Sequence, residues 1–398
     1  MRIRCMRTHR LQTVSFSLLS KYLIHRTCSH RSMYSLSISI SIQMNMITKC
    51  CLLLLFAGVN TIRVSAQSDS SITTPACLSC LCSKDATPAG VMISHVHPKG
   101  EWMLSYRYMG MRGKGIEQNG RPVTNDQVYD QDYLMSSDNM HMDMHMLMAM
   151  YGLTKNLTLM GMVEYNRSTM NMQAPEGSAH VHNGVPMSSG MAHDMKASGL
   201  GDVSVTALYA LVNSFNHHLL VSGGITIPTG SIQTKGGAAS MYPEQRYPYM
   251  MQQGSGTWDV LPGLTYTFQH NKIMASSQLC AAIRTGYNTV GYKLGNKYSF
   301  NNWVGYRWLD WFSTSLRAEA NTTGSISGSD PTLYAYNEPS ANPYNYGGQT
   351  ITGYAGVNFY FLGKNKIGIE GGLPLYQKAN GIQTAASSTI HLNYTLVF

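Results

Sequence analysis

Methionine and histidine are numerous enough in this chain, and spaced regularly enough, to do chemistry. The chain has 27 methionines and 14 histidines among 398 residues, and many of them gather in two stretches. In the first, 140–150, methionine alternates with other residues, so a strand would place the methionines on one face and the histidines on the other. The candidate metal ligands of this stretch are His141, Met142, Met144, His145, Met146 and Met148.

The second stretch, 168–201, is expected to form a long loop. Thioether sulfur is a soft ligand that suits Cu(I), and imidazole suits copper and zinc. We expect the loop to collect such ions, and Met160, Met162 and Glu164 of the preceding strand to pass them on. The alternative is that methionine is an adaptable apolar filler, which explains the strand equally well and the loop less well. The loop's candidate ligands are His180, His182, Met187, Met191, His193 and Met195.

Three cysteines, Cys77, Cys80 and Cys82, form a third candidate site. As thiolates they could bind Cu(I) or Zn(II). In an oxidising compartment two of them could instead form a disulfide and leave one thiol over. The sequence leaves both interpretations open.

The charge of the chain gives no reason to expect a nucleic-acid partner. Only 12% of the residues are charged, against about 25% in an average soluble domain. The formal net charge of +9 comes largely from basic residues before position 50, and no basic stripe with regularly spaced aromatic residues follows.

A targeting segment precedes the rest of the chain. Lys49 is followed by an apolar run, 50–57, which is too short for a membrane helix of about 20 residues. The small residues Ser65 and Ala66 predict cleavage of a secretory signal peptide near Ala66. The expected segments are 1–43, a non-native upstream extension; 44–66, the signal peptide; 67–94, a periplasmic segment with cysteine and histidine; and 95–398, a membrane domain.

The membrane domain is expected to be all-β. About twelve segments of roughly ten residues alternate apolar and polar side chains, and short connections alternate with long ones. This pattern is typical of an antiparallel transmembrane β-barrel with short periplasmic turns and long outer loops. The last segment alternates up to Phe398, which resembles the insertion signal of outer-membrane proteins. The expected strands are 102–111, 142–151, 157–167, 202–212, 218–227, 257–268, 273–286, 298–308, 311–321, 351–361, 366–375 and 389–398.

The strands present one face to lipid and the other to the lumen. The hairpin at 153–156 decides which face of 142–150 points inwards. A three-residue connection would place its methionines inside with Met160 and Met162, and a four-residue connection would place His141, Asp143 and His145 inside. The expected charged lumen residues are Arg107, Glu164, Arg284, Arg307, Arg317, Glu319 and Glu370.

Several glycine-rich stretches carry a family resemblance. Residues 199–203 (GLGDV), 227–231 (IPTGS) and 254–259 (GSGTWD) resemble the outer-membrane barrel family named for the meta-pathway of phenol degradation, whose members are often called transporters. The segment 97–109 and the methionine strand with the following Tyr-Gly-Leu-Thr are similar to a methionine-rich branch of that family. The resemblance covers roughly 95–398 and implies an outer-membrane channel, with a methionine and histidine content like that of members associated with copper or heavy-metal handling. It implies no catalytic residues, and the cysteine cluster is not part of it.

The leading hypothesis is an outer-membrane transporter or channel linked to soft-metal handling, with Cu(I), Ag(I) or Zn(II) as cargo and no required cofactor. The alternative is the same barrel passing small hydrophobic or aromatic organic solutes. Less favoured are a passive metal-buffering surface protein and an outer-membrane hydrolase, for which His391 is present but no G-x-S-x-G motif.

We expect no enzyme. The expected partners are the lipid bilayer, the outer-membrane assembly machinery, and metal ions or small solutes. The sequence leaves open the substrate, the direction of transport, the openness of the lumen, the oligomeric state, and whether 67–94 plugs the barrel.

Overall fold

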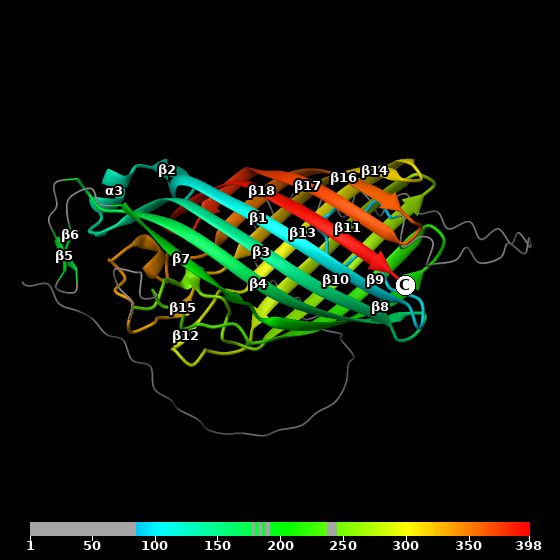
Figure 1. Cartoon of the computed structure of the whole chain (residues 1–398), viewed down its shortest axis with the longest axis horizontal. Helices are drawn as coiled ribbons and strands as arrows, with labels where there is room; N and C mark the ends of the chain where they lie inside the picture. Colours follow the sequence, from blue (N-terminus) through cyan, green and yellow to red (C-terminus); the bar gives the residue numbers. More distant parts are fainter. Residues whose placement is uncertain (1–84, 177–179, 183–184, 188–191, 237–244) are drawn as a thin grey trace, which may run out of the picture. The chain divides into compact units, whose positions relative to one another are not determined.

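The alternating segments form long antiparallel strands that close into a ring (Figure 1). The computed structural model describes residues 85–176, 180–182, 185–187, 192–236 and 245–398, all of which belong to the compact unit Thr73–Phe398. The expected upstream extension, signal peptide and cleavage site lie outside the described residues. The ring consists of twelve strands: β1 (Trp102–Gln118), β3 (Ser136–Gly152), β4 (Leu157–Gln173), β8 (Val203–Asn213), β9 (His217–Ile227), β10 (Asp259–His270), β11 (Ile273–Arg284), β13 (Lys297–Leu309), β14 (Phe312–Thr323), β16 (Gly348–Phe361), β17 (Asn365–Ala379) and β18 (Ile382–Val397).

The pairing of the first and last strands closes the barrel. Each strand pairs with the next of the twelve in chain order, and β18 pairs with β1 from Met103–Val397 to Gln118–Ile382. Closure leaves no unpaired edge, which is the condition for spanning a bilayer with strands. The expected fold, a closed antiparallel barrel of twelve strands, is confirmed.

The two ends of the barrel differ in their connections. Turns of a few residues join β3 to β4, β8 to β9, β10 to β11, β13 to β14 and β16 to β17. The opposite end carries the long loops, whose elements are β2 (Arg121–Val123), α3 (Asn125–Tyr129), β5 (His180–His182), β6 (Val185–Met187), β7 (Ala192–Leu200), η1 (Tyr249–Met251), β12 (Tyr292–Lys293), β15 (Ser327–Gly328) and η2 (Pro339–Ala341). Among the described residues, no helix has the length and apolar character to cross a membrane.

Several strands extend further into the loops than expected. β1 continues to Gln118 and β18 begins at Ile382, beyond the expected ends at 111 and 389. Ile116 of β1 and Ile382 of β18 pack with Val128 and Tyr133 in a buried cluster. Apolar burial against the loop therefore supports strand pairing where the local sequence does not show it.

Candidate functional site: the lumen and its plug

Methionine forms much of the inner surface of β1, β3 and β4. Direct pairing places Met103 beside Met150 and Met150 beside Met160, and the pattern continues along the strands towards the loops. Directly paired residues share one face of a sheet. We call this surface the methionine wall; it consists of Met103, Met109, Met111, Met140, Met142, Met144, Met146, Met148, Met150, Met160, Met162 and Met170.

The hairpin between β3 and β4 settles which face points inwards. Its last paired residues are Gly152 and Thr158, so five residues intervene (153–157), rather than three or four. Any odd number gives the same parity as three, so the methionines of β3 share the face of Met160. Met150 and Met160 are buried, and this face is therefore the lumen face. His141 and His145 face outwards, where His145 Nδ1 lies 2.7 Å from Tyr106 Oη. Of the two alternatives for this strand, the structure thus has the methionines inside and His141 and His145 outside.

Residues 85–97, which precede β1, cross the lumen. Arg107 of β1 donates hydrogen bonds to the carbonyl oxygens of Ala89 (2.8 Å) and Val91 (2.5 Å). Gln278 of β11 donates to the carbonyl oxygen of Ile93 (2.5 Å). β1 and β11 are six strands apart in the ring of twelve and so stand on opposite sides of it. We call residues 85–97 the plug. The sequence left open whether 67–94 plugs the barrel, and the described part of that segment, from residue 85 on, does lie in the lumen.

Charged residues of the lumen hold the plug in place. Glu370 accepts a hydrogen bond from the backbone nitrogen of Gly90 at 2.7 Å. Arg317 is bidentate to the same carboxylate, at 2.9 Å and 3.1 Å, and also bonds Glu319 at 3.0 Å. Charge-assisted bidentate pairs of this kind are strong and fix geometry. Of the expected lumen residues, Arg107 and Glu370 thus bind the plug directly, and Arg317 holds Glu370 and Glu319 in place on the lumen wall.

The start of the plug is fixed by a buried ion pair. Lys366 Nζ lies 2.9 Å from Asp85 Oδ1 and donates to the carbonyl oxygen of Thr87 at 2.9 Å. His95 Nδ1 lies 3.5 Å from Asp85 Oδ2. Burial disfavours the charge on Asp85, but Lys366 and His95 outweigh burial and hold the pKa of this carboxyl well below its usual range.

Two inward-facing glycines make room for the plug. A Cβ on Gly305 of β13 would lie 2.6 Å from the carbonyl oxygen of Ala86, and a Cβ on Gly368 of β17 would lie 3.1 Å from the Cβ of Ala89. Sequence analysis missed this role, and it also missed Lys366, although alternation places Lys366 on the same face as Glu370. The position of Lys366, four residues from the lumen carboxylate of Glu370 on the same strand, could have predicted that it faces the lumen.

The remaining expected lumen residues also face inwards. Glu164 pairs across the sheet with buried Met146, and Arg307 pairs with buried Ser313. Arg284 forms an ion pair with Asp259.

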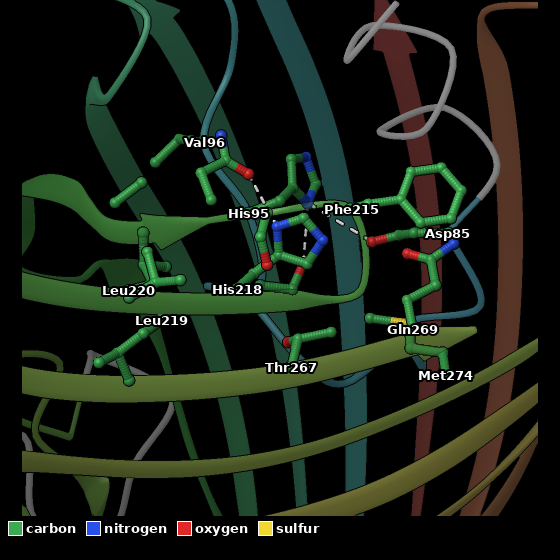
Figure 2. A pocket seen from close by; sticks show the side chains of 15 residues that line it. Asp85, His95, Val96, Phe215, His218, Leu219, Leu220, Thr267, Gln269 and Met274 are labelled. Carbon is green, nitrogen blue, oxygen red and sulfur yellow. Dashed lines mark hydrogen bonds and ion pairs between the residues drawn. The ribbon is translucent and has the colours of Figure 1, made fainter. Parts of the chain in front are cut away.

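A cavity of about 240 Å³ lies between the plug and the wall of β8, β9, β10 and β11, next to the short turns. Figure 2 shows His95 and His218 among its side chains, together with Leu219, Leu220 and Met274. Most of its lining is apolar. At the polar corner, His95 Nε2 is buried and has no hydrogen-bond partner among the described residues.

At the loop end the methionine wall continues into a buried cluster, with which it shares Met140, Met142 and Met170. The outer methionine cluster consists of Met135, Met140, Met142, Met170, Met172, Met195, Met250 and Met251, packed with Ala197 and Tyr247. A cavity of about 20 Å³ touches Met170 and Met250 of this cluster and is also lined by Glu338 and Ser340. Burial raises the pKa of Glu338 to about 7, against the opposing effect of a hydrogen bond from Ser340.

The structure places only part of the other expected metal ligands: His180 pairs with Met187 across β5 and β6, and His193 pairs with Met172 across β7 and β4. Cys77, Cys80, Cys82 and Met191 lie outside the described residues, and His180, His182, Met187 and His193 are placed by their strands alone. Within the part of the chain that the structure describes, no group of three histidine, cysteine, aspartate or glutamate side chains is arranged to hold a metal ion. Methionine is the donor type that does gather.

Comparisons with known proteins support the barrel. A family model described as "Putative MetA-pathway of phenol degradation" matches residues 167–332. These residues leave out β3 and its methionines, so the methionine-rich branch is not supported. A search of curated proteins finds no matching relative.

Solved structures with a similar fold include an outer-membrane channel from Pseudomonas putida F1, with 16% identity, a TM-score of 0.51, and coverage of 76% of this chain and 97% of that one. A FadL homologue from Pseudomonas aeruginosa has 10% identity, a TM-score of 0.35, and coverage of 75% and 90%. The CymD monoaromatic hydrocarbon channel has 8% identity, a TM-score of 0.34, and coverage of 76% and 89%. At this identity the first likeness shows the fold alone, and the two lower scores carry no argument about this chain.

Proposed function

We propose that the chain is an outer-membrane channel for small apolar organic solutes, with monocyclic aromatic compounds that bear one hydroxyl as the preferred class. The main support is the apolar cavity beside the plug, of about 240 Å³. An engineered apolar cavity of roughly 150 Å³ stays dry and binds benzene. The present cavity therefore has room for a substituted benzene ring.

The cavity continues into the methionine wall. Ala210 and Leu220 line it and belong to the same buried cluster as Met150 and Met160. Methionine is apolar and flexible, so a surface built from it adapts to solutes of different shape. A solute that leaves the cavity along the lumen thus meets apolar side chains.

The polar corner of the cavity, at His95, explains why we expect the preferred solutes to bear a hydroxyl group. Buried polar atoms of proteins are nearly always hydrogen-bonded, yet His95 Nε2 has no partner in the described part of the chain. A phenolic hydroxyl bound in the cavity would supply one once the imidazole of His95, which lines the cavity, turns Nε2 towards it. The proposal therefore distinguishes phenols from plain hydrocarbons of the same size.

The fold and the family match favour this proposal over soft-metal traffic as the main function. The closed barrel and its likeness to an outer-membrane channel support a place in the outer membrane, and the matching family is described by phenol degradation. For a hydrolase, a nucleophile must lie within hydrogen-bond reach of a base. Among the described residues, His391 Nε2 is buried and makes no hydrogen bond, so it is not paired with a serine hydroxyl there.

The test is uptake of radiolabelled 4-methylphenol by cells that carry the chain in their outer membrane. Ala210→Leu fills the cavity, and we expect it to lower uptake severalfold. Ala207→Leu is the matched control, because Ala207 lies on the opposite face of the same strand. Folding of both variants is checked by the heat-dependent gel mobility of folded barrels, since overpacking costs about 1–3 kcal/mol. Equal uptake by the two variants would show that the solute does not pass through the cavity.

A further inference from the structure

The outer methionine cluster is not needed by a channel for organic solutes. Leucine would fill an apolar core as well, and it loses less side-chain entropy on burial than methionine does. Eight methionines from β3, β4, β7, η1 and the segments beside them nevertheless meet at this one place. What these side chains share beyond their apolar character is sulfur.

Three of these methionines stand in one row across three strands. Met140 of β3 pairs with Met170 of β4, and Met170 pairs with Met195 of β7. Neighbouring strands lie about 4.8 Å apart, and methionine has three rotatable bonds. The sulfur atoms of the outer two residues can therefore turn towards the middle one. All three side chains are buried.

An ion-sized cavity adjoins the middle residue. It measures about 20 Å³, and a cavity of roughly 10–15 Å³ already holds one water molecule. Its lining includes Met170, Met250, Glu338 and Ser340, and the side chains of Met140 and Met195 would reach it by turning towards Met170. Ser340 Oγ lies 3.7 Å from Met170 Sδ and 2.9 Å from Glu338 Oε2. Glu338 is 4% exposed, and no basic side chain pairs with it among the described residues. The site thus combines thioether sulfur with a buried carboxyl that lacks a cation.

We propose that Met140, Met170 and Met195 bind one monovalent soft cation, Cu(I) or Ag(I), with Glu338 beside it. Thioether sulfur selects Cu(I) over the harder divalent metals. A site closed off from water by apolar neighbours favours a weakly hydrated soft ion. This inference does not depend on the organic-solute channel, because the cavity of that proposal lies at the other end of the barrel.

The chain contains its own control. Met103, Met150 and Met160 form a similar row across β1, β3 and β4, and they too are buried. This row packs against Val96 of the plug. It therefore has the same number of sulfur atoms as the proposed site, but the carboxyl that shares a small cavity with Met103, that of Asp85, is already paired with Lys366.

The experiment measures Ag(I) bound per chain by equilibrium dialysis of the purified, folded, processed chain. Its thiols are first alkylated so that cysteine does not compete. Two triple variants are compared, M140L/M170L/M195L and M103L/M150L/M160L, because exchanging methionine for leucine nearly conserves side-chain volume and removes the sulfur. X-ray absorption of the Cu(I)-loaded chain then reports whether sulfur surrounds the metal.

We expect the first variant to lose one bound Ag(I) per chain and the second to keep it, with sulfur around Cu(I) in the unaltered chain. Equal Ag(I) binding by both variants and the unaltered chain would overturn the proposal, as would an equal loss in both. Uptake of 4-methylphenol is measured in parallel. If uptake fails while the Ag(I) difference stands, the organic-solute function is lost and the metal site remains.

Discussion

The ion pair of Asp85 and Lys366 gives the plug a single residue whose change should release it. Removing one partner of a buried pair leaves an uncompensated charge and costs about 3–5 kcal/mol. This destabilisation is relieved when the plug dissociates from the lumen wall, because water can then solvate Lys366. We therefore expect Asp85→Asn to raise the single-channel conductance of the chain in planar bilayers. Asp126→Asn, at an exposed acid in α3, is the control, and equal conductance of the two variants would contradict the assignment.

The same carboxyl determines how conductance responds to acid. The pKa of Asp85 in the folded chain lies below its usual value, which is about 3.9. The stability that this carboxylate contributes is therefore present above the usual value and is lost only as the pH falls through the lowered one. We expect the unaltered chain to keep its low conductance at pH 3. A rise near pH 4 that is missing from Asp85→Asn would show that Asp85 titrates like an exposed aspartate.

At the scale of elements, the inward orientation of the methionines of β3 can be tested by charge. Leu147 faces outwards and is 59% exposed in the isolated barrel, whereas Met144 faces the lumen. An arginine facing lipid near the middle of the bilayer costs about 2–4 kcal/mol. We expect Leu147→Arg to lower the free energy of unfolding in vesicles by that amount and Met144→Arg to lower it less, as measured by guanidinium titration. The reverse order would mean that the hairpin parity is wrong.

The strands were predictable from the sequence because each one depends on a local pattern. Alternation of side chains places β11 and β14 within a few residues, and the same alternation placed Arg317 and Glu370 in the lumen. The direction of the methionine ladder was not predictable, because it depends on one turn whose length is fixed by tertiary pairing. The plug was not predictable either, since 85–97 has no period and its partners, such as Lys366, are remote in the sequence.

At the scale of the whole described unit, the ring and the plug are separable. The ring closes through β1 and β18, and no residue of the plug takes part in that pairing. When 85–97 is deleted, water can enter the lumen and solvate the charged side chains of Arg107, Lys366 and Glu370. We therefore expect the deletion variant to fold and insert, to melt at a lower temperature because Val96 is lost from its buried cluster, and to conduct at least as well as Asp85→Asn. A deletion variant that inserts but does not conduct would show that a part of the chain other than the plug blocks the lumen. The outer methionine cluster would then be the barrier, and the M140L/M170L/M195L variant in the deletion background would show whether sulfur or packing closes it.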